Sequence, residues 1–587
     1  MVQQFKQYYR TILLAFGFIL VGVLVLKWQG KQWRNEVINS DGKGYYYFLP
    51  ALFQGEKDYR KTLKQEEEVM GKPPQNYILK TEEGKFVNKC YPGVALLQTP
   101  SFLLACGVDF VLGNPFHGYS DTHLYFFFWT NVLLLFLGVL LLKTNLSTYF
   151  GQKRFTWLIA LLTVFATNIG YQAFFYPALS HQYTFFLVNV WIYCFLKWKN
   201  TEKTSVLFWF ALVSGLLFLV RPTNLLFFLI LPFLAGNRNT LKALFSDLFV
   251  LRNGKLLKAL FVFLLPIAIL PALTYWQTGH LFYWSYQGEG FIFNGSHWAD
   301  TWFSYRCGIL IHTPLVALGL IGAIVFWKKE RFAISMISLA LACITFILSS
   351  WWCWDYQLFF GHRGFTEYQV ITAFLLMYFV QLFKRAFWMY VLLAIPVLYL
   401  SIRTFQKISG IYPVQKFTAT TFWKSLFDVD SGTKEKYVVL TNCQPYGKIL
   451  AEYDLMKGKT TYRKVGLGAD PWTELTFEIP AEYKQCRFYL EVHANKRLLN
   501  GTEDWKGISI IFSGSSNSGQ QTHYGGAPFY NYYREGKEKW AGFDLAEEYN
   551  PSDDGTEKIS VFIWNPENKQ FEMDDFRATI KAITSKK

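Results

Sequence analysis

The sequence predicts a polytopic α-helical membrane domain followed by an all-β sandwich domain. Hydrophobic residues make up 52% of the 587-residue chain, aromatic residues 19% and charged residues 17%. The apolar residues come in blocks close to the length of about 20 that a membrane-spanning helix needs. From about residue 410 these blocks give way to short strand-like runs separated by turns. We therefore expect a membrane domain over 1–405 and a β-domain over 410–587.

The apolar blocks predict about eleven spans. They lie near 11–28, 124–142, 155–170, 183–197, 205–220, 223–236, 258–276, 306–327, 332–350, 368–383 and 386–402. Between the first two, residues 29–123 are expected to form a long outer loop with interfacial helices. Within it, 93–113 is apolar but contains Pro100, Ser101 and Asp109. This segment is better placed as an interfacial or re-entrant helix than as a span.

The charged residues between the blocks predict an orientation. Lys6 and Arg10 precede the first block, and no small-residue cleavage site follows it, which indicates a retained signal anchor with a cytoplasmic N-terminus. Every loop that is then inside carries Lys or Arg, and 237–257 has the pattern of a basic amphipathic helix on the inner leaflet. These loops account for much of the net charge of +16, so nucleic-acid binding is not expected. An odd number of spans places the β-domain outside.

The β-domain is predicted from runs that alternate between apolar and polar residues. These runs are Tyr437–Thr441, Thr473–Ile479, Arg487–Val492, Gly507–Ser513 and Lys558–Trp564. The closing stretch from Val561 to Phe576 resembles the last two strands of jelly-roll carbohydrate-binding modules. The aromatic residues between Tyr524 and Trp540 would suit a saccharide platform, or they fill the core. Cys443 and Cys486 are either a disulfide or two separate thiols.

Several short motifs lie on the predicted outer side of the membrane domain. They are Ser40-Asp41-Gly42-Lys43-Gly44-Tyr45-Tyr46, Tyr91-Pro92-Gly93, Ser180-His181-Gln182-Tyr183, the Trp-rich run Trp351–Asp355, and Gly361-His362-Arg363-Gly364-Phe365. Together with the topology, this set resembles bacterial members of the C-type glycosyltransferase (GT-C) superfamily over about residues 10–400. The resemblance implies a GT-C-like fold and a sugar taken from a polyprenyl-phosphate donor.

Sugar transfer from a lipid phosphate needs a base for the acceptor hydroxyl and cations for the departing phosphate. Asp41 is the candidate base, and its alternative role is to begin an Asp-Gly turn. Arg363 is the leading phosphate ligand because a guanidinium can hold phosphate oxygens bidentately, and its alternative role is that of a snorkelling interfacial arginine. The further candidates for the phosphate are His362, Arg221, Arg306 and Lys89. The candidates for the sugar or acceptor are His181, Tyr45, Tyr46, Glu289 and Glu367.

No cofactor is expected. A divalent metal site would need two or more carboxylates around one ion, and Asp41 has no carboxylate beside it in the sequence. The sequence also lacks CxxC or Cys/His spacing for structural zinc. A divalent metal is therefore possible but not favoured.

These observations favour a glycosyltransferase at the outer face of a bacterial inner membrane, with a lipid, a glycan or a protein as acceptor. One alternative is a ligase or polymerase of undecaprenyl-diphosphate-linked glycans, which shares the chemistry. A second is a flippase or transporter of lipid-linked sugars, which would usually carry charged sites at mid-membrane and repeated halves. A third, a binding protein on a single anchor, leaves about ten of the spans unexplained.

Overall fold

The computed structural model of the chain describes residues 2–30, 33–71, 77–249, 254–286, 289–356, 361–383, 385–409, 422–423, 425–429, 439–440, 449–465, 475–484, 486–499, 508–528, 541–549, 556–565 and 569–583. The chain divides into two compact units. The first, helical unit comprises 1–298, 313–354 and 363–398. The second unit comprises 299–312, 355–362 and 399–587, and it contains the two larger β-sheets.

Each predicted span coincides with a helix or with two consecutive helices. They are α1 (Val2–Gln29), α6 (Asp121–Phe150), α7 (Thr156–Phe165) with α8 (Asn168–Phe175), α9 (Ser180–Thr201), α10 (Thr204–Val220), η2 (Pro222–Ile230) with α11 (Leu231–Ala235), α13 (Lys255–Ile267) with α14 (Ile269–Thr278), α16 (Ile309–His312) with α17 (Leu315–Phe326), α18 (Arg331–Ser349), α19 (Gln369–Val380) and α20 (Ala386–Ile408). Apolar helices of this kind followed by β-sheets confirm the predicted fold class.

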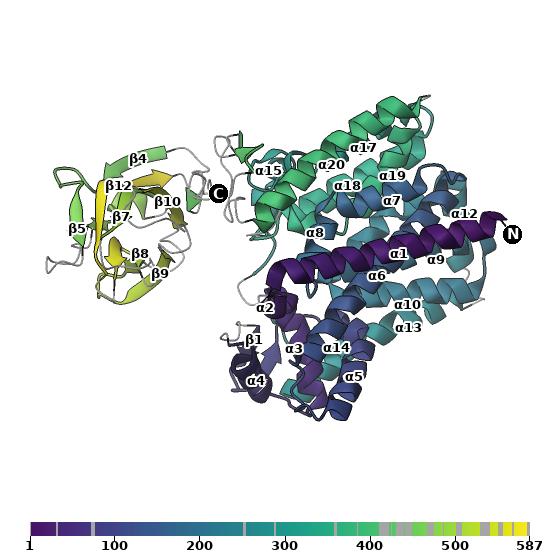
Figure 1. Cartoon of the computed structure of the whole chain (residues 1–587), viewed down its shortest axis with the longest axis horizontal. Helices are drawn as coiled ribbons and strands as arrows, with labels where there is room; N and C mark the ends of the chain where they lie inside the picture. The colour runs from purple at the N-terminus through teal and green to yellow at the C-terminus, as the bar shows by residue number, and fades with distance from the viewer. Residues whose placement is uncertain are drawn as a thin grey trace. The chain divides into compact units, whose positions relative to one another are not determined.

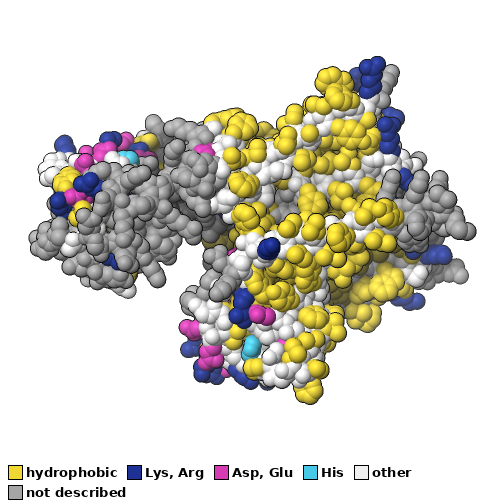
Figure 2. Space-filling model, in the orientation of Figure 1, with side chains coloured by type: hydrophobic (Ala, Val, Ile, Leu, Met, Phe, Trp, Pro, Cys, Tyr) yellow, Lys and Arg dark blue, Asp and Glu magenta, His cyan; other side chains and the backbone are white. Residues whose placement is uncertain are grey.

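The helices are those of a multi-pass membrane protein. Among the described residues, six helices are long and apolar enough to cross a membrane, and α7 with α8, bent by 58° at a break, is a broken span or a re-entrant loop. Four further apolar helices are shorter. Figure 2 shows hydrophobic side chains along the helices, with Lys and Arg at the end of the unit that bears the N-terminus. Helix α12 (Arg238–Phe249) lies at that end (Figure 1).

The small elements of the long loop gather at the opposite end of α1 (Figure 1). They are α2 (Trp33–Val37), α3 (Asp41–Phe53), α4 (Arg60–Met70), β1 (Ile78–Lys80) and β2 (Phe86–Asn88). A buried ion pair between Lys43 and Glu66, with an N–O distance of 2.7 Å, ties α3 to α4. The Tyr47 hydroxyl donates to the same carboxylate at 2.7 Å. Helix α3 is thereby fixed in place, and its first residue is Asp41.

Helix α5 (Gly93–Leu112) lies obliquely against α6. The Gln98 amide donates to the Phe127 carbonyl at 3.1 Å, and Asp109 contacts His123 at 2.9 Å. Gly93, the other end of α5, abuts the backbone at Val220, where α10 ends. Helix α5 is also apolar and long enough to span a membrane, so its interfacial placement stays a prediction.

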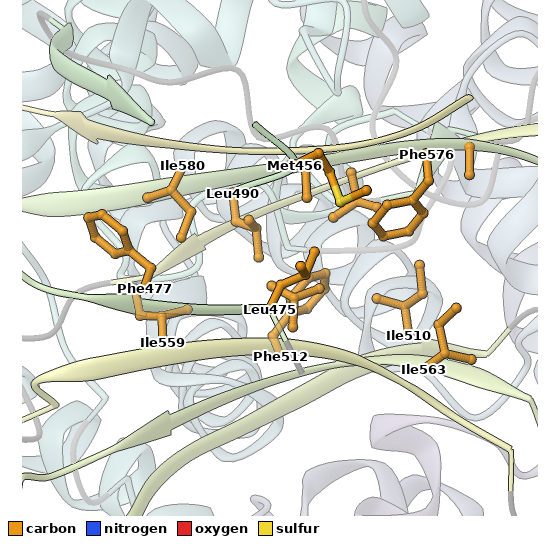
Figure 3. Packing of buried hydrophobic residues seen from close by; sticks show 14 of the residues in the cluster. Met456, Leu475, Phe477, Leu490, Ile510, Phe512, Ile559, Ile563, Phe576 and Ile580 are labelled. Atoms are coloured by element: carbon orange, nitrogen blue, oxygen red, sulfur yellow. The ribbon is translucent and has the colours of Figure 1, made fainter. Parts of the chain in front are cut away.

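The strands of the second unit form a two-sheet sandwich. One sheet has the order β3 (Val439–Leu440), β10 (Ala541–Tyr549), β7 (Arg487–Leu498), β12 (Phe571–Ile583) and β4 (Ile449–Asp454), with β5 (Arg463–Val465) also paired to β12. The other has the order β6 (Leu475–Glu478), β11 (Lys558–Trp564), β8 (Ser509–Ser515) and β9 (Gln521–Pro528). Figure 3 shows Leu490 and Ile580 of the first sheet facing Phe512 and Ile559 of the second across a shared core.

Two predictions for this domain depend on residues outside the described ranges. Cys486 is a buried free thiol, whereas Cys443 is not among the described residues. Tyr524 lies on β9, but the other aromatic residues of the predicted saccharide platform, Phe529, Tyr530, Tyr532, Tyr533 and Trp540, also fall outside the described ranges. The platform therefore remains a prediction.

Candidate active site

Asp41 occupies the first turn of α3 and faces into the helical unit. Its carboxylate forms an ion pair with the guanidinium of Arg363 and accepts a hydrogen bond of 2.9 Å from the Tyr77 hydroxyl. The Asp41 side chain is 30% exposed and that of Arg363 is 13% exposed, so the pair is at the edge of the protein interior. The carboxylate form of this side chain is the one that can accept a proton.

The segment that carries Arg363 is anchored by polar side chains of α8. Arg363 begins a short 3-10 helix, η5 (Arg363–Phe365). The next residue, Thr366, donates its hydroxyl to the Arg363 carbonyl at 2.8 Å. The same hydroxyl oxygen accepts from Asn168 at 2.9 Å and from Gln172 at 2.8 Å. Thr366, Asn168 and Gln172 are all buried, so these hydrogen bonds hold the turn in place and limit the movement of the Arg363 guanidinium.

A continuous network extends from Asp41 through Arg363 to three further charged or polar groups. The Arg363 Nε donates to His181 Nε2 at 3.2 Å, and His181 Nδ1 donates to Glu367 at 2.5 Å. The Arg221 Nη1 donates to the other Glu367 oxygen at 3.1 Å. Four separate segments of the chain thus meet at one site, where two guanidiniums face two carboxylates with an imidazole between them.

Two glycines of the sequence motifs permit this approach. A Cβ atom on Gly42 would overlap with the Cβ of Ala178, three residues before His181. A Cβ atom on Gly93 would overlap with the backbone of Val220, directly before Arg221. Only glycine lacks a Cβ atom, so glycine at these two positions lets α3 pack closely before α9, which carries His181, and lets α5 pack closely at the end of α10, next to Arg221.

Burial and neighbouring charges act in opposite directions on the pKa values of the network. Burial alone would raise the pKa of Glu367, but His181 and Arg221 outweigh it and hold the pKa below its usual range. Burial lowers the pKa of Arg363 to about 10, with Glu367 opposing the change, so the side chain remains a cation at neutral pH. Burial also raises the pKa of Tyr45 to about 12. The Tyr45 hydroxyl, which donates to Ser180 at 3.4 Å, therefore stays protonated.

A second ion pair lies beside this network. Lys89 pairs with Glu289, and the Lys89 ammonium is 5.2 Å from the centroid of the Tyr286 ring. Tyr286 stacks on Tyr91 with the ring centroids 6.4 Å apart. Burial raises the pKa of Tyr286, and the nearby charge of Arg221 opposes this change to a smaller extent. The predicted residues Lys89 and Glu289 are therefore neighbours of each other and of the Arg221 end of the network.

A cavity of about 420 Å³ opens beside Lys89 and Tyr91. Its walls are the segment after β2, the residue Phe218 of α10, the junction of α13 with α14, and the loop 281–285. Most of these side chains are apolar, and Phe282 and Trp284 at its edge are 84% and 67% exposed. The cavity thus offers an apolar surface that is continuous with the outside of the helical unit and ends near charged groups.

For three further predicted site residues, the described contacts are with groups other than those of the network. The Tyr46 hydroxyl donates to the Gly118 carbonyl, and its ring packs against Phe102, so its role in binding sugar stays a prediction that these contacts do not support. Arg306 pairs with Asp355 within the second unit. His362 is buried in that same unit, edge-on to Tyr356 with the ring centroids 5.6 Å apart.

Sequence reasoning missed several groups that complete the site. They are Tyr77, Ser180, Tyr286, Thr366, Asn168 and Gln172. The two amides could have been suspected, because Asn and Gln are rare within apolar helices unless they are hydrogen-bonded. Among the described residues, no group of three or more His, Cys, Asp or Glu side chains is arranged to hold a metal ion.

Comparisons with known proteins add little to this geometry. No protein-family model matches the sequence, and no curated protein matches it either. Among solved structures, the arabinosyltransferase EmbB from Mycobacterium smegmatis aligns with 94% of this chain at 10% sequence identity and a TM-score of 0.35. The alignment covers 64% of the EmbB chain, so this chain spans less than two thirds of its length. At that TM-score the similarity carries no functional argument, and the site rests on its own contacts.

Proposed function

We propose that the chain is a membrane glycosyltransferase that moves a sugar from a polyprenyl-phosphate donor to a lipid, glycan or protein acceptor at the outer face of a bacterial inner membrane. The observation that carries the proposal is the network in which a carboxylate, Asp41, and two arginines, Arg363 and Arg221, converge. Inner-membrane location and the orientation of the termini rest on the basic loops of the sequence.

In this proposal Asp41 is the general base. The acceptor hydroxyl approaches its exposed side, and the carboxylate removes the hydroxyl proton as the oxygen attacks the anomeric carbon. Tyr77 holds one carboxylate oxygen at 2.9 Å and so orients the other toward the reaction. The carbon–oxygen bond to the phosphate breaks at the same time, and the departing phosphate gains negative charge.

The arginines stabilise that charge. We assign the donor phosphate to Arg363, where it takes the place of Asp41 as the partner of the guanidinium, with Arg221 as the second cation. We take the transfer to invert the anomeric carbon, so that the base and the leaving phosphate lie on opposite faces of the sugar. Arg363 must therefore leave Asp41 when it binds the phosphate. Glu367 and His181 hold the two arginines and do not touch the reacting atoms in this scheme.

The apolar cavity beside Lys89 suits the first part of the donor's prenyl chain. Its exposed apolar edge would let the remainder of the chain stay in lipid, which transfer from a membrane-borne donor requires. Lys89, although paired with Glu289, stands between this cavity and the Arg221 end of the network. The donor would therefore lie with its chain in the cavity and its phosphate at the arginines.

The proposal is tested by purifying the full chain in detergent and assaying it with radiolabelled prenyl-phosphate sugars. Transfer of label to an acceptor, lost in the Arg363→Ala variant, is the expected result. A chain that carries an intact lipid-linked sugar across vesicles without cleaving it would instead be a transporter. Use of prenyl-diphosphate glycans in place of monophosphate sugars would favour the ligase or polymerase.

A further inference from the structure

A second cluster of reactive side chains lies where α5 crosses the first turn of α6, apart from the network described above. The Sγ atom of Cys106 is 3.4 Å from Nε2 of His123. On the other side of the imidazole, Nδ1 of His123 is 2.9 Å from the Asp109 carboxylate. The imidazole thus stands between a thiol and a carboxylate, which is the order of groups in nucleophilic triads.

The surrounding hydrogen bonds select the tautomer of His123. Ser120 donates its hydroxyl proton to Asp109, so its oxygen presents a lone pair to Nδ1 at 2.8 Å. Asn114 donates to the other Asp109 oxygen at 2.9 Å and keeps the carboxylate in place. With two acceptors facing Nδ1, the proton belongs on that atom. The unprotonated Nε2 then faces the Cys106 thiol and can accept its proton.

The two halves of the cluster differ in exposure. The side chains of His123 and Asp109 are 1% and 2% exposed, whereas Cys106 is half-buried. On the same face of α5, three residues before Cys106 and four after it, Leu103 and Phe110 are 48% and 86% exposed. The thiol therefore opens onto an apolar surface of the helix. A substrate that reaches it would be apolar, as an acyl chain in a membrane is.

We propose that Cys106 is a nucleophile that accepts an acyl group from a lipid-borne ester, with His123 as general base and Asp109 as the residue that positions the imidazole. The thiol proton moves to Nε2 of His123 as the sulfur attacks the acyl carbon. The bond from that carbon to the ester oxygen breaks, and the imidazolium returns the proton to the departing alcohol. The products are a Cys106 thioester and an alcohol, with no change in oxidation state.

The test uses the full chain in phospholipid vesicles and the 4-nitrophenyl esters of a long and a short fatty acid. The long-chain ester should release about one equivalent of 4-nitrophenol and leave a hydroxylamine-sensitive adduct on Cys106, as mapped by peptide mass. Cys343 is the matched control, since it is another half-buried free thiol on an apolar helix. The Cys106→Ser variant should lose the adduct, and Cys343→Ser should keep it.

The role of the imidazole is tested in the same assay. His123→Gln should slow acylation by about 100-fold or more, the range of general-base catalysis. Asp109→Asn should slow it less and shift its pH profile, because the imidazole remains but is no longer oriented. If these variants do not fold, the proposal is tested by comparing the acylation rates of Cys106 and Cys343 in the wild-type chain, where Cys106 should react faster. Equal acylation of both thiols, no adduct at Cys106, or an unchanged rate in folded His123→Gln would overturn the proposal.

Discussion

Replacement of Asp41 by Asn separates the proposed base from the proposed phosphate ligand. The amide keeps the size of the side chain and can still accept the hydrogen bond from Tyr77, but it cannot take a proton. General-base catalysis contributes about 10²- to 10⁴-fold, or about 3–5 kcal/mol of the activation free energy. The substitution also removes the carboxylate that competes with phosphate for Arg363. We therefore expect kcat to fall by that factor while the KM for the donor stays unchanged or decreases.

Replacement of Arg363 by Ala should act in the opposite way on the KM. A hydrogen bond to a charged group contributes about 1.5–3 kcal/mol, so loss of the guanidinium should raise the donor KM and lower kcat/KM by about 10- to 150-fold. The assay is initial-rate transfer from radiolabelled prenyl-phosphate sugar at varied donor concentration.

The matched control for Asp41→Asn is Asp58→Asn. Asp58 is 32% exposed and paired with Arg60, so it resembles Asp41 in burial and pairing but is outside the network. Its substitution should leave both constants unchanged. Full transfer by Asp41→Asn, or an equal loss in the Asp58 variant, would refute the assignment of Asp41 as the base.

The remaining predictions concern Glu367, Arg363, metal removal and Gly42. Glu367→Gln leaves the Arg221 guanidinium without its anion and weakens the hydrogen bond from His181, and it should lower stability by about 3–5 kcal/mol in thermal unfolding. Glu83→Gln, in an exposed pair, should change nothing measurable. Since the pKa of Glu367 is lowered, this stability difference should be constant from pH 8 to pH 5 and be lost only as the pH falls through that lowered pKa. As the pH is raised, the Arg363→Lys variant should lose donor binding at a lower pH than the wild type, in which the pKa of Arg363 is about 10. EDTA should leave wild-type transfer unchanged. Gly42→Ala should cost about 1–3 kcal/mol by overpacking, while Gly17→Ala, with open space around it, should be neutral or stabilising.

The membrane domain could be predicted from the sequence because its signals are local. An apolar block of span length needs no knowledge of its neighbours, and Lys or Arg in a loop indicates the side of the membrane by itself. Arg221 was noticed for a similar reason, because the predicted topology puts its turn on the outer side, where positive charge is not expected. Arg363 was noticed instead from the Gly361–Phe365 motif and from the ability of a guanidinium to hold phosphate. Their partnership with Glu367 could not be predicted, because it joins residues 146 positions apart for Arg221 and depends on how the helices pack.

Tyr45 and Tyr46 are neighbours in the sequence but differ in their surroundings. Neighbouring residues on a helix point about 100° apart, so the motif alone could not predict which of the two side chains of α3 lies nearer the network. The structure places Tyr45 next to Ser180 and Tyr46 in the packing against Phe102. In the β-domain, strands with clear alternation such as β11 were predicted. The Gly-containing strand β9 was missed because glycine is depleted in strands and weakens the signal.

The network is better explained by function than by stability. Buried ion pairs commonly add little to stability over apolar side chains of the same size, since removing charges from water costs about as much as their attraction returns. The spans themselves show that this chain can fill its interior with apolar residues. It nevertheless keeps a fully buried His181 and Glu367 behind the partly exposed pair of Asp41 and Arg363. Exposure thus increases toward the two groups that would meet substrate, and the buried groups serve to hold them, which is the arrangement expected of a reaction site.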